Sequence, residues 1–272
     1  MSLEELAVVR QLLAGLVTGE ARSLEDFRTS YDEAGKAFGL PEGVTVTPVS
    51  AGGVPGEWLA PAAGAGKRVL LYLHGGGYAL GSLDSHRHLA ARAALALKGR
   101  VLLIDYRRSP EHPFPAAVDD ALAAYRWLIE TGVDPAKLAV AGDSAGGGLT
   151  VAVLLAARDA GLGLPAAAVC ISPWANLENK GASYGAKANV DPMVRHADLE
   201  LWTAAYLGTS TPRRTPLASP VYADLKGLPP FLIQVGSSEV LLSDSHLLAD
   251  RLKEAGVSVN LHVWPEMIHV WH

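Results

Sequence analysis

The segment around Ser144 contains residue types that could carry out covalent chemistry. It reads Gly142-Asp143-Ser144-Ala145-Gly146, a G-x-S-x-G pattern, and it lies between an apolar stretch typical of a strand and one typical of a helix. Small residues on both sides of the serine allow the sharp strand-to-helix turn that exposes its hydroxyl group. The pattern therefore predicts that Ser144 is the nucleophile of a reaction with a covalent intermediate.

A run of glycines after the predicted strand 69–73 could stabilise negative charge. It reads His74-Gly75-Gly76-Gly77, and residues without side chains let backbone N–H groups come close to a ligand oxygen. Such donors are what the oxyanion of a tetrahedral intermediate requires. A phosphate-binding loop is the competing interpretation, but the Walker lysine pattern and the G-x-G-x-x-G spacing are both absent from the sequence.

Two carboxylates that follow the predicted strand 231–235 compete for the role of the acid that supports a histidine base. Glu239 comes directly after the carboxyl end of that strand, where the active sites of α/β sheets are assembled. Asp244 follows Ser243 at the start of a helix, and the helix dipole and N-terminal capping explain its position. We therefore favour Glu239 as the acid and keep Asp244 as the alternative.

The base should be a histidine that follows the acid in the chain, because this order accompanies a serine in a G-x-S-x-G turn. Of the nine histidines, only His269 and His272 lie in the loop after the last predicted strand, 258–264. The final residue, His272, is expected to be frayed. We therefore predict His269 as the base.

Strands and amphipathic helices alternate from residue 68 onwards, and this order determines the predicted architecture. The predicted strands are 69–73, 101–104, 138–141, 166–171, 231–235 and 258–264, and the predicted helices are 86–97, 116–130, 147–160 and 244–255. Such alternation favours a mostly parallel sheet with helices on both faces. Two short strands, 44–47 and 57–59, precede it and predict an antiparallel edge.

Two segments lie outside this alternation. The first forty residues are predicted to be helical, and Ser23 is a candidate N-cap for the second part of that helical region. Residues 177–216 are polar, apart from an aromatic helix at 199–207, which indicates an insertion. We predict one structural domain with a core of residues 46–176 and 217–272 and a cap of residues 1–45 and 177–216.

The sequence resembles the hormone-sensitive-lipase-like esterases, the bacterial family IV of the α/β-hydrolase superfamily, over essentially its whole length. Besides the two glycine-containing motifs, the segment YRRSPEHPFPAA at 106–117 is similar to a proline-rich segment of that family. Arg108 and Ser109 stand there in place of the more usual Leu and Ala. The resemblance implies a serine carboxylesterase that needs no cofactor, with an α/β-hydrolase fold and a helical cap.

The resemblance also assigns further residues of the site. It implies that the N–H groups of Gly76, Gly77 and Ala145 form the oxyanion hole, whereas His74 supports the loop and does not titrate in the reaction. The family usually has Asp at the position of the acid, so Glu239 departs from the pattern by one methylene group.

Three aromatic residues are predicted to contact the substrate. Trp202 and Tyr206 are spaced as neighbours on one helix of the insertion, where they either line an acyl pocket or bury the insertion against the core. Phe38 belongs to the apolar stripe of the N-terminal helix, which we expect to fill space above Ser144. A closed pocket of this kind, together with the resemblance, predicts acyl chains of roughly two to eight carbons.

Other activities would use the same residues. A hydrolase of lactones or aryl amides shares every catalytic group, so the sequence leaves this alternative open. A ligand-sensing protein on the same fold is an alternative of a different class, of which plant hormone receptors that have lost the histidine are examples. The presence of Ser144, Glu239 and His269 together argues against it.

The composition is typical of a globular protein that acts on a small molecule. Of the 272 residues, 49% are apolar, and the net charge of −5 comes with no basic run, so neither nucleic acid nor an anionic membrane is an expected partner. The single cysteine, Cys170, lies in an apolar run and is expected in the core. The H-x-H pattern of His86 and His88 lacks the further ligands of a metallohydrolase, so no metal site is predicted.

The sequence has neither the pattern of a signal peptide nor an apolar run of the ~18 residues that span a bilayer, so we predict a cytoplasmic protein without a membrane span. The expected partner is a small-molecule ester, and the oligomeric state, including a homodimer, stays open. Members of the family that the sequence resembles continue beyond the position of His272 into a helix that packs on the sheet. We therefore expect that a tail is disordered or has been removed, which would leave His269 less rigid.

Overall fold

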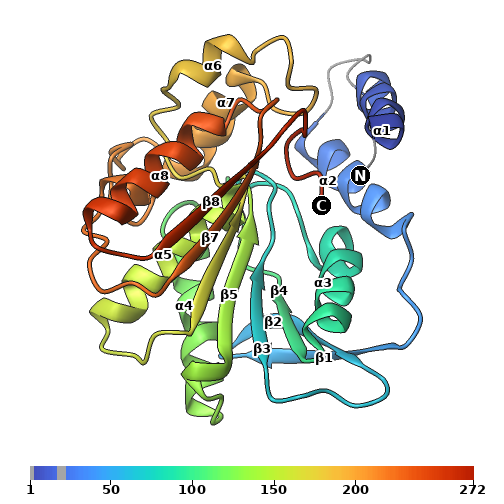
Figure 1. The fold of residues 1–272 in the computed structure, drawn as a ribbon, viewed down its shortest axis with the longest axis vertical. Helices are drawn as coiled ribbons and strands as arrows, with labels where there is room; N and C mark the ends of the chain where they lie inside the picture. Colours follow the sequence, from blue (N-terminus) through green and yellow to red (C-terminus); the bar gives the residue numbers. More distant parts are fainter. Residues whose placement is uncertain (1–2, 17–22) are drawn as a thin grey trace.

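The computed structural model describes residues 3–16 and 23–272 and has the predicted α/β architecture (Figure 1). Its strands are β1 (Val44–Ala51), β2 (Val54–Pro61), β3 (Val69–Leu73), β4 (Arg100–Ile104), β5 (Leu138–Asp143), β6 (Ala167–Ile171), β7 (Phe231–Gly236) and β8 (Val259–Trp264). Its α-helices are α1 (Leu3–Leu16), α2 (Leu24–Lys36), α3 (Leu83–Leu97), α4 (Ala116–Glu130), α5 (Ala145–Asp159), α6 (Ala182–Ala186), α7 (His196–Leu207) and α8 (Leu242–Glu254). Short 3-10 helices span Pro135–Lys137 and Pro220–Tyr222.

All eight strands form one sheet, which is mostly parallel as predicted. They lie in the order β1-β2-β4-β3-β5-β6-β7-β8, and only β2 runs antiparallel to its neighbours β1 and β4. The predicted short strands at 44–47 and 57–59 are longer in the structure because β1 and β2 pair along their whole length in a hairpin. The carboxyl ends of the parallel strands lie at one edge of the sheet, so the loops that follow β3, β5, β6, β7 and β8 converge there.

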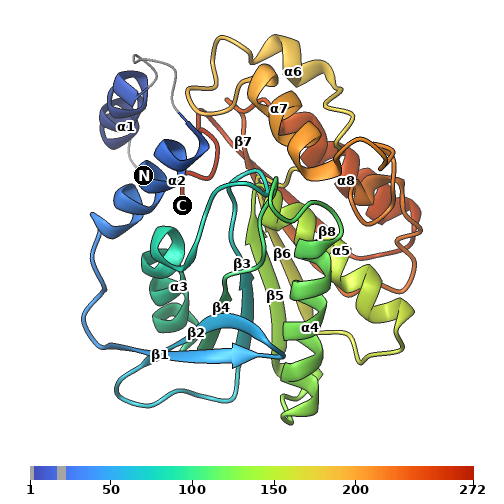
Figure 2. The ribbon, with the colours of Figure 1, turned by 180° about the vertical axis from the view of Figure 1, so that it is seen from behind.

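Helices cover both faces of the sheet, but unequally. On one face, Ala90, Ala91 and Ala94 of α3 pack in a cluster with Tyr72 and Leu103 of the central strands. On the other face, the sheet is covered by α4, α5 and α8 (Figure 2). Their side chains form a larger core with the alternate side chains of the same strands. Cys170 of β6 is buried in that core, as predicted.

The segments outside the alternating pattern contain the remaining helices. The Oγ of Ser23 accepts the N–H of Asp26 and the Asp26 carboxylate accepts the N–H of Ser23, so α2 begins with a capping box. Residues 1–2 and 17–22, which the helix prediction also covered, lie outside the described residues. Helices α1, α6 and α7 lie beyond the end of the sheet at which the parallel strands finish (Figures 1 and 2).

The helices within residues 177–216 differ from the prediction. The predicted helix at 199–207 starts three residues earlier, at His196, and the short helix α6 was not predicted. Over residues 3–16 and 23–272, none of the helices combines the length and the apolar character needed to cross a membrane.

Candidate active site

Ser144 occupies a strained turn between β5 and α5. Its φ of 52° lies in the left-handed region, which residues with side chains seldom adopt. A side chain on Gly146 would collide with the carbonyl oxygen of Leu73, so the turn can come this close to β3 only because that residue is glycine. The Ser144 N–H donates to the Ile171 carbonyl at 2.8 Å. The serine is thereby held at the ends of three neighbouring strands. It lies in the turn between a strand and a helix, as the G-x-S-x-G pattern predicted.

The predicted oxyanion donors lie at the same edge of the sheet. Gly76 and Gly77 have φ values of 112° and 63°, conformations that favour glycine. Ala145 is the first residue of α5, so its N–H has no partner inside the helix. Within the described part of the chain, the N–H groups of these three residues donate no hydrogen bond to protein atoms. They are therefore available to an oxygen of a ligand.

Asp143, which precedes Ser144, binds the glycine loop to the turn that carries the serine. Its Oδ1 accepts the Gly75 N–H at 3.1 Å and the Tyr72 hydroxyl at 2.9 Å, and the His86 Nε2 lies 3.3 Å from the same oxygen. Burial alone would raise the pKa of Asp143, but the interactions with His86 and Tyr72 outweigh it and lower the pKa below its usual value. The carboxylate is thus a buried anionic anchor of the loop.

Glu239 and His269 form a buried pair. The Nδ1 of His269 lies 2.9 Å from the Oε2 of Glu239, and the other carboxylate oxygen accepts hydrogen bonds from the Ser172 hydroxyl and the Gly236 N–H. Burial lowers the pKa of His269, but the hydrogen bond and charge of Glu239 raise it more, so the net change is upward. The carboxylate therefore orients the imidazole ring and favours its charged form.

Asp244, the alternative acid, has a different environment. Its Oδ2 accepts the N–H groups of Ala175 and Asn176 at 3.1 and 3.0 Å, and its Oδ1 accepts the Tyr184 hydroxyl at 2.8 Å. Burial raises the pKa of Asp244 to about 7 against these hydrogen bonds. The residue anchors the loop after β6; it does not cap α8, whose start has no side-chain cap.

The end of β6 and the loop that follows it contact both the serine turn and the segment that carries His269. Ile171 accepts the Ser144 N–H, and the hydroxyl of the next residue, Ser172, donates to Glu239 and accepts the Val270 N–H at 3.3 Å. The structure records no hydrogen bond between the Ser144 hydroxyl and His269, both of which are described. Catalytic hydrogen bonds of this kind are often long until a substrate binds.

His74 and His272 are both held by contacts with neighbouring residues. Burial lowers the pKa of His74 to about 3, and its ring stacks on Tyr106 at 4.1 Å, which fits the predicted role of holding the loop. His272 was expected to be frayed, but its Nε2 lies 2.6 Å from the Oε1 of Gln234 and its ring lies 4.0 Å from that of Trp271. That expectation is wrong because the side chain has partners on β7 and in its own loop.

The predicted substrate contacts differ in their surroundings. Trp202 of α7 lies against Gly77, where an added Cβ would come within 3.0 Å of its ring. Tyr206 is fully buried and stacks on Tyr78 at 3.8 Å, so it fills the interior and does not line an open pocket. Phe38 is 72% exposed and its ring lies beside that of His88, on α3, so the structure does not place it above Ser144. Only Trp202 of the three lies at the glycine loop.

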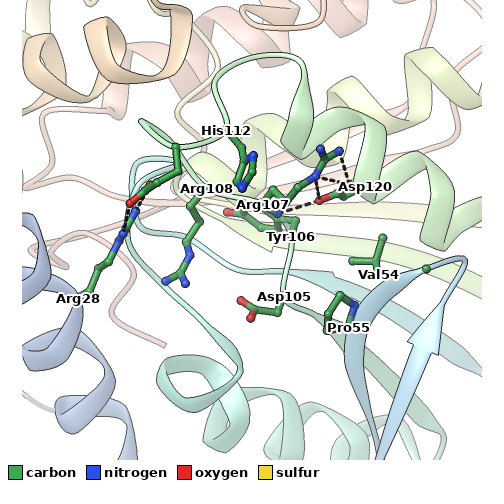
Figure 3. A pocket seen from close by; sticks show the side chains of 11 residues that line it. Arg28, Val54, Pro55, Asp105, Tyr106, Arg107, Arg108, His112 and Asp120 are labelled. Carbon is green, nitrogen blue, oxygen red and sulfur yellow. Dashed lines mark hydrogen bonds and ion pairs between the residues drawn. The ribbon is translucent and has the colours of Figure 1, made fainter.

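A hollow of about 390 Å³ lies elsewhere, beside the loop after β4 (Figure 3). Its walls carry ion pairs, of Arg28 with Glu111 at 2.7 Å and of Arg107 with Asp120 at 2.7 Å. No side chain of the serine, glutamate and histidine described above borders it. Over the described ranges 3–16 and 23–272, no group of three or more potential ligand side chains could hold a metal ion.

Sequence reasoning did not identify Ser172 or the role of Asp143. Both stand at the carboxyl ends of parallel strands, β6 and β5, and this position was the available signal for each of them.

The chain is similar to known hydrolases along its length. A family model described as alpha/beta hydrolase fold matches residues 70–272. An acetyl-hydrolase of Streptomyces hygroscopicus is 50% identical over 275 residues, which cover 100% of this chain and 90% of that protein. The crystal structure of an esterase from the bacterial hormone-sensitive lipase family is 44% identical, with a TM-score of 0.96, and the match covers 100% of this chain and 91% of that one. The chain belongs to the hormone-sensitive-lipase-like esterases of the α/β-hydrolase superfamily.

Other members of this esterase family match it as well. The putative acetyl-hydrolase LipR of Mycobacterium tuberculosis is 38% identical over 232 residues, which are 85% of this chain and 75% of that protein. A crystal of EstE5 soaked with p-nitrophenyl butyrate gives a TM-score of 0.93 at 42% identity and covers 98% of this chain and 90% of that one. The protein is a carboxylic ester hydrolase, as the sequence predicted.

Proposed function

We propose that this esterase hydrolyses short-chain acyl esters with Ser144 as the nucleophile, His269 as the base and Glu239 as the acid that orients it. The observation that carries the proposal is the 2.9 Å contact between Glu239 and the Nδ1 of His269. It leaves the Nε2 of the ring for proton transfer. Both residues follow parallel strands, β7 and β8, whose carboxyl ends lie at the same edge of the sheet as that of β5.

In the proposed reaction, the Nε2 of His269 takes the proton of the Ser144 hydroxyl while the serine oxygen attacks the ester carbonyl carbon. The negative charge of the tetrahedral intermediate falls on the former carbonyl oxygen, which accepts hydrogen bonds from Gly76, Gly77 and Ala145. His269 then gives its proton to the departing alcohol, and an acyl-enzyme remains. A water molecule repeats the cycle, which releases the carboxylic acid and restores the serine.

We propose that residues 1–45 and 177–216 form a cap over the core of residues 46–176 and 217–272. The position of Trp202 against Gly77 supports this division, because it brings a residue of the insertion to the oxyanion loop. The Trp202 ring lies nearly perpendicular to that of Phe27 of α2, with ring centroids 6.4 Å apart, so both parts of the proposed cap meet there.

The same contact supports the preference for short acyl chains. A bulky indole beside the oxyanion donors limits the room for the acyl group, and relatives described as acetyl-hydrolases fit such a site. The hydrolysis of lactones or aryl amides would use the same groups and remains an alternative. A ligand-sensing protein on this fold would need no catalytic base. In this protein His269 has a buried carboxylate partner, which argues against that alternative.

Turnover of nitrophenyl esters with acyl chains from two to sixteen carbons tests the activity and the acyl preference together. A lactone and a nitroanilide of matched acyl length belong in the same series. We expect the highest kcat/KM for an ester of two to eight carbons, roughly where a compact pocket is filled. The absence of ester turnover in folded wild-type protein would refute the proposal.

A further inference from the structure

Asp191 of the cap insertion reaches the turn that carries Glu239. Its Oδ2 accepts the N–H of Val240, the residue directly after the glutamate, at 2.9 Å. Forty-nine residues separate the two in sequence, so this is a tertiary contact between the insertion and the core. The side chain is 7% exposed, and the mechanism proposed above gives it no role.

Both carboxylate oxygens of Asp191 serve as acceptors for backbone groups. The Oδ1 accepts the N–H groups of Met193 and Val194 at 2.9 and 3.0 Å, which fixes the turn before α7. No ion pair of Asp191 with Lys, Arg or His occurs among the described residues. An asparagine could accept through one side-chain atom only and would point its NH₂ group at an N–H donor on the other side. A carboxylate is therefore required for all three contacts.

The same charge acts on the proposed base. Burial lowers the pKa of His269, and the hydrogen bond and charge of Glu239, followed by the charges of Asp191 and then Asp143, raise it. These three carboxylates come from three different parts of the chain: the β7–α8 turn, the insertion and the end of β5.

We propose, on the basis of the triad proposed above, that Asp191 is a positioning residue for the reaction. It fixes the backbone of the Glu239 turn from the cap insertion and so keeps the acid in contact with His269. The insertion is then part of the machinery that orients the base, in addition to any role in covering the substrate. Its negative charge also favours the imidazolium that forms when the serine attacks.

The test compares Asp191→Asn and Asp191→Glu with a matched control, Asp198→Asn, in the same insertion. Asp198 pairs with Arg195 at 2.7 Å on the surface, so its neutralisation changes the net charge equally without touching the acid turn. The measurement is kcat and KM for p-nitrophenyl butyrate between pH 5 and 9, with thermal unfolding of each variant.

We expect Asp191→Asn to lower kcat by about 10- to 100-fold with little change in KM. A misplaced acid reduces the stabilisation of the transition state but does not affect the binding of the substrate. Loss of the negative charge should also move the acidic limb of the kcat/KM profile to lower pH by roughly 0.5 to 1 pH unit. Asp191→Glu keeps the charge but shifts its oxygens by one methylene group, so kcat should fall while the limb stays near that of the wild type. This second variant carries the test if Asp191→Asn fails to fold.

A double variant separates positioning from general damage to the fold. If Asp191 acts through Glu239, then Asp191→Asn should cost less than about threefold in kcat when Glu239→Gln is already present. Full additivity of the two losses, or an Asp191→Asn variant that matches Asp198→Asn in kcat and pH profile, would overturn the proposal. An inactive wild type or an active Ser144→Ala variant would instead refute the proposed function.

Discussion

The N–H of Gly75 donates to the Oδ1 of Asp143 at 3.1 Å, so the residue before Ser144 holds the loop that contains the proposed oxyanion donors. A side chain on Gly75 would collide with this carboxylate, which shows how closely the two segments approach. The positions of Ser144 and of Gly76 therefore depend on one buried anion.

Replacement of Asp143 by Ala should lower the free energy of unfolding and the activity together. The change removes the buried acceptor of the Tyr72 hydroxyl, the shorter of the two hydrogen bonds of the Gly75 N–H and the carboxylate partner of His86, which should cost about 3–5 kcal/mol. Urea unfolding measures this loss. The control Asp159→Ala removes an exposed carboxylate and should change stability by less than about 0.5 kcal/mol. Equal effects of the two variants would contradict the anchoring role.

Replacement of Ser144 by Ala should abolish ester turnover and leave the fold intact. Among residues 3–16 and 23–272 the Ser144 hydroxyl makes no hydrogen bond, so its loss should remove the chemistry and little stability. Circular dichroism and thermal unfolding serve as the control for folding. Turnover above about one thousandth of the wild-type rate in purified variant protein would disprove the assignment.

Glu239→Gln should mainly lower the rate, whereas Asp244→Asn should mainly lower the stability. Neutralisation of a triad carboxylate lowers the rate by about 10⁴-fold, so we expect a loss of that order for Glu239→Gln. Asp244→Asn removes an acceptor from the loop after β6 and should lower stability by about 1–3 kcal/mol with a much smaller effect on kcat. If the larger kinetic loss followed the Asp244 variant, the acid would be wrongly assigned.

The pH profile should reflect the raised pKa of His269. The base must be neutral to accept the serine proton, so kcat/KM should fall as the pH drops through an apparent pKa above the ordinary 6.5. The raised pKa of His269 also contributes to the stability of the folded protein. This contribution is complete below about pH 6.5, where the imidazole is protonated in both the folded and the unfolded chain, and it is lost as the pH rises through the folded-state pKa. Glu239→Gln removes the interaction that raises the pKa of His269 most, so the acidic limb of the kcat/KM profile should move to lower pH. An acidic limb already below pH 6 in the wild type would contradict the pairing of Glu239 with His269.

The acyl preference should depend on Trp202. Each methylene group that fits adds up to about 0.8 kcal/mol of burial, so kcat/KM should rise with chain length and then drop once the pocket is full. Trp202→Ala removes the ring that lies against Gly77 and should move the optimum to longer chains. The exposed Phe38→Ala variant is the matched control and should leave the profile unchanged. A wild-type profile that still climbs at sixteen carbons would refute the cap over the site.

The sequence by itself determined the parts of this protein that depend on local pattern. Alternating apolar runs set the order of strands and helices, and the glycines around Ser144 and in the 74–77 loop permit backbone conformations that other residues avoid. The family and the esterase class followed from the same motifs, and the comparisons bear them out.

Only the tertiary structure decided which side chains meet. Glu239 and Asp244 are five residues apart and both lie near the start of one helix, yet the turn directs the first to His269 and the second to the loop after β6. Trp202 and Tyr206 are four residues apart on α7, yet one lies at the glycine loop and the other stacks inside the core. The spacing of residues along the chain indicates only which side chains share a face of one helix or strand. The contacts described here depend on the order of the strands in the sheet, which brings together residues 30 or more positions apart.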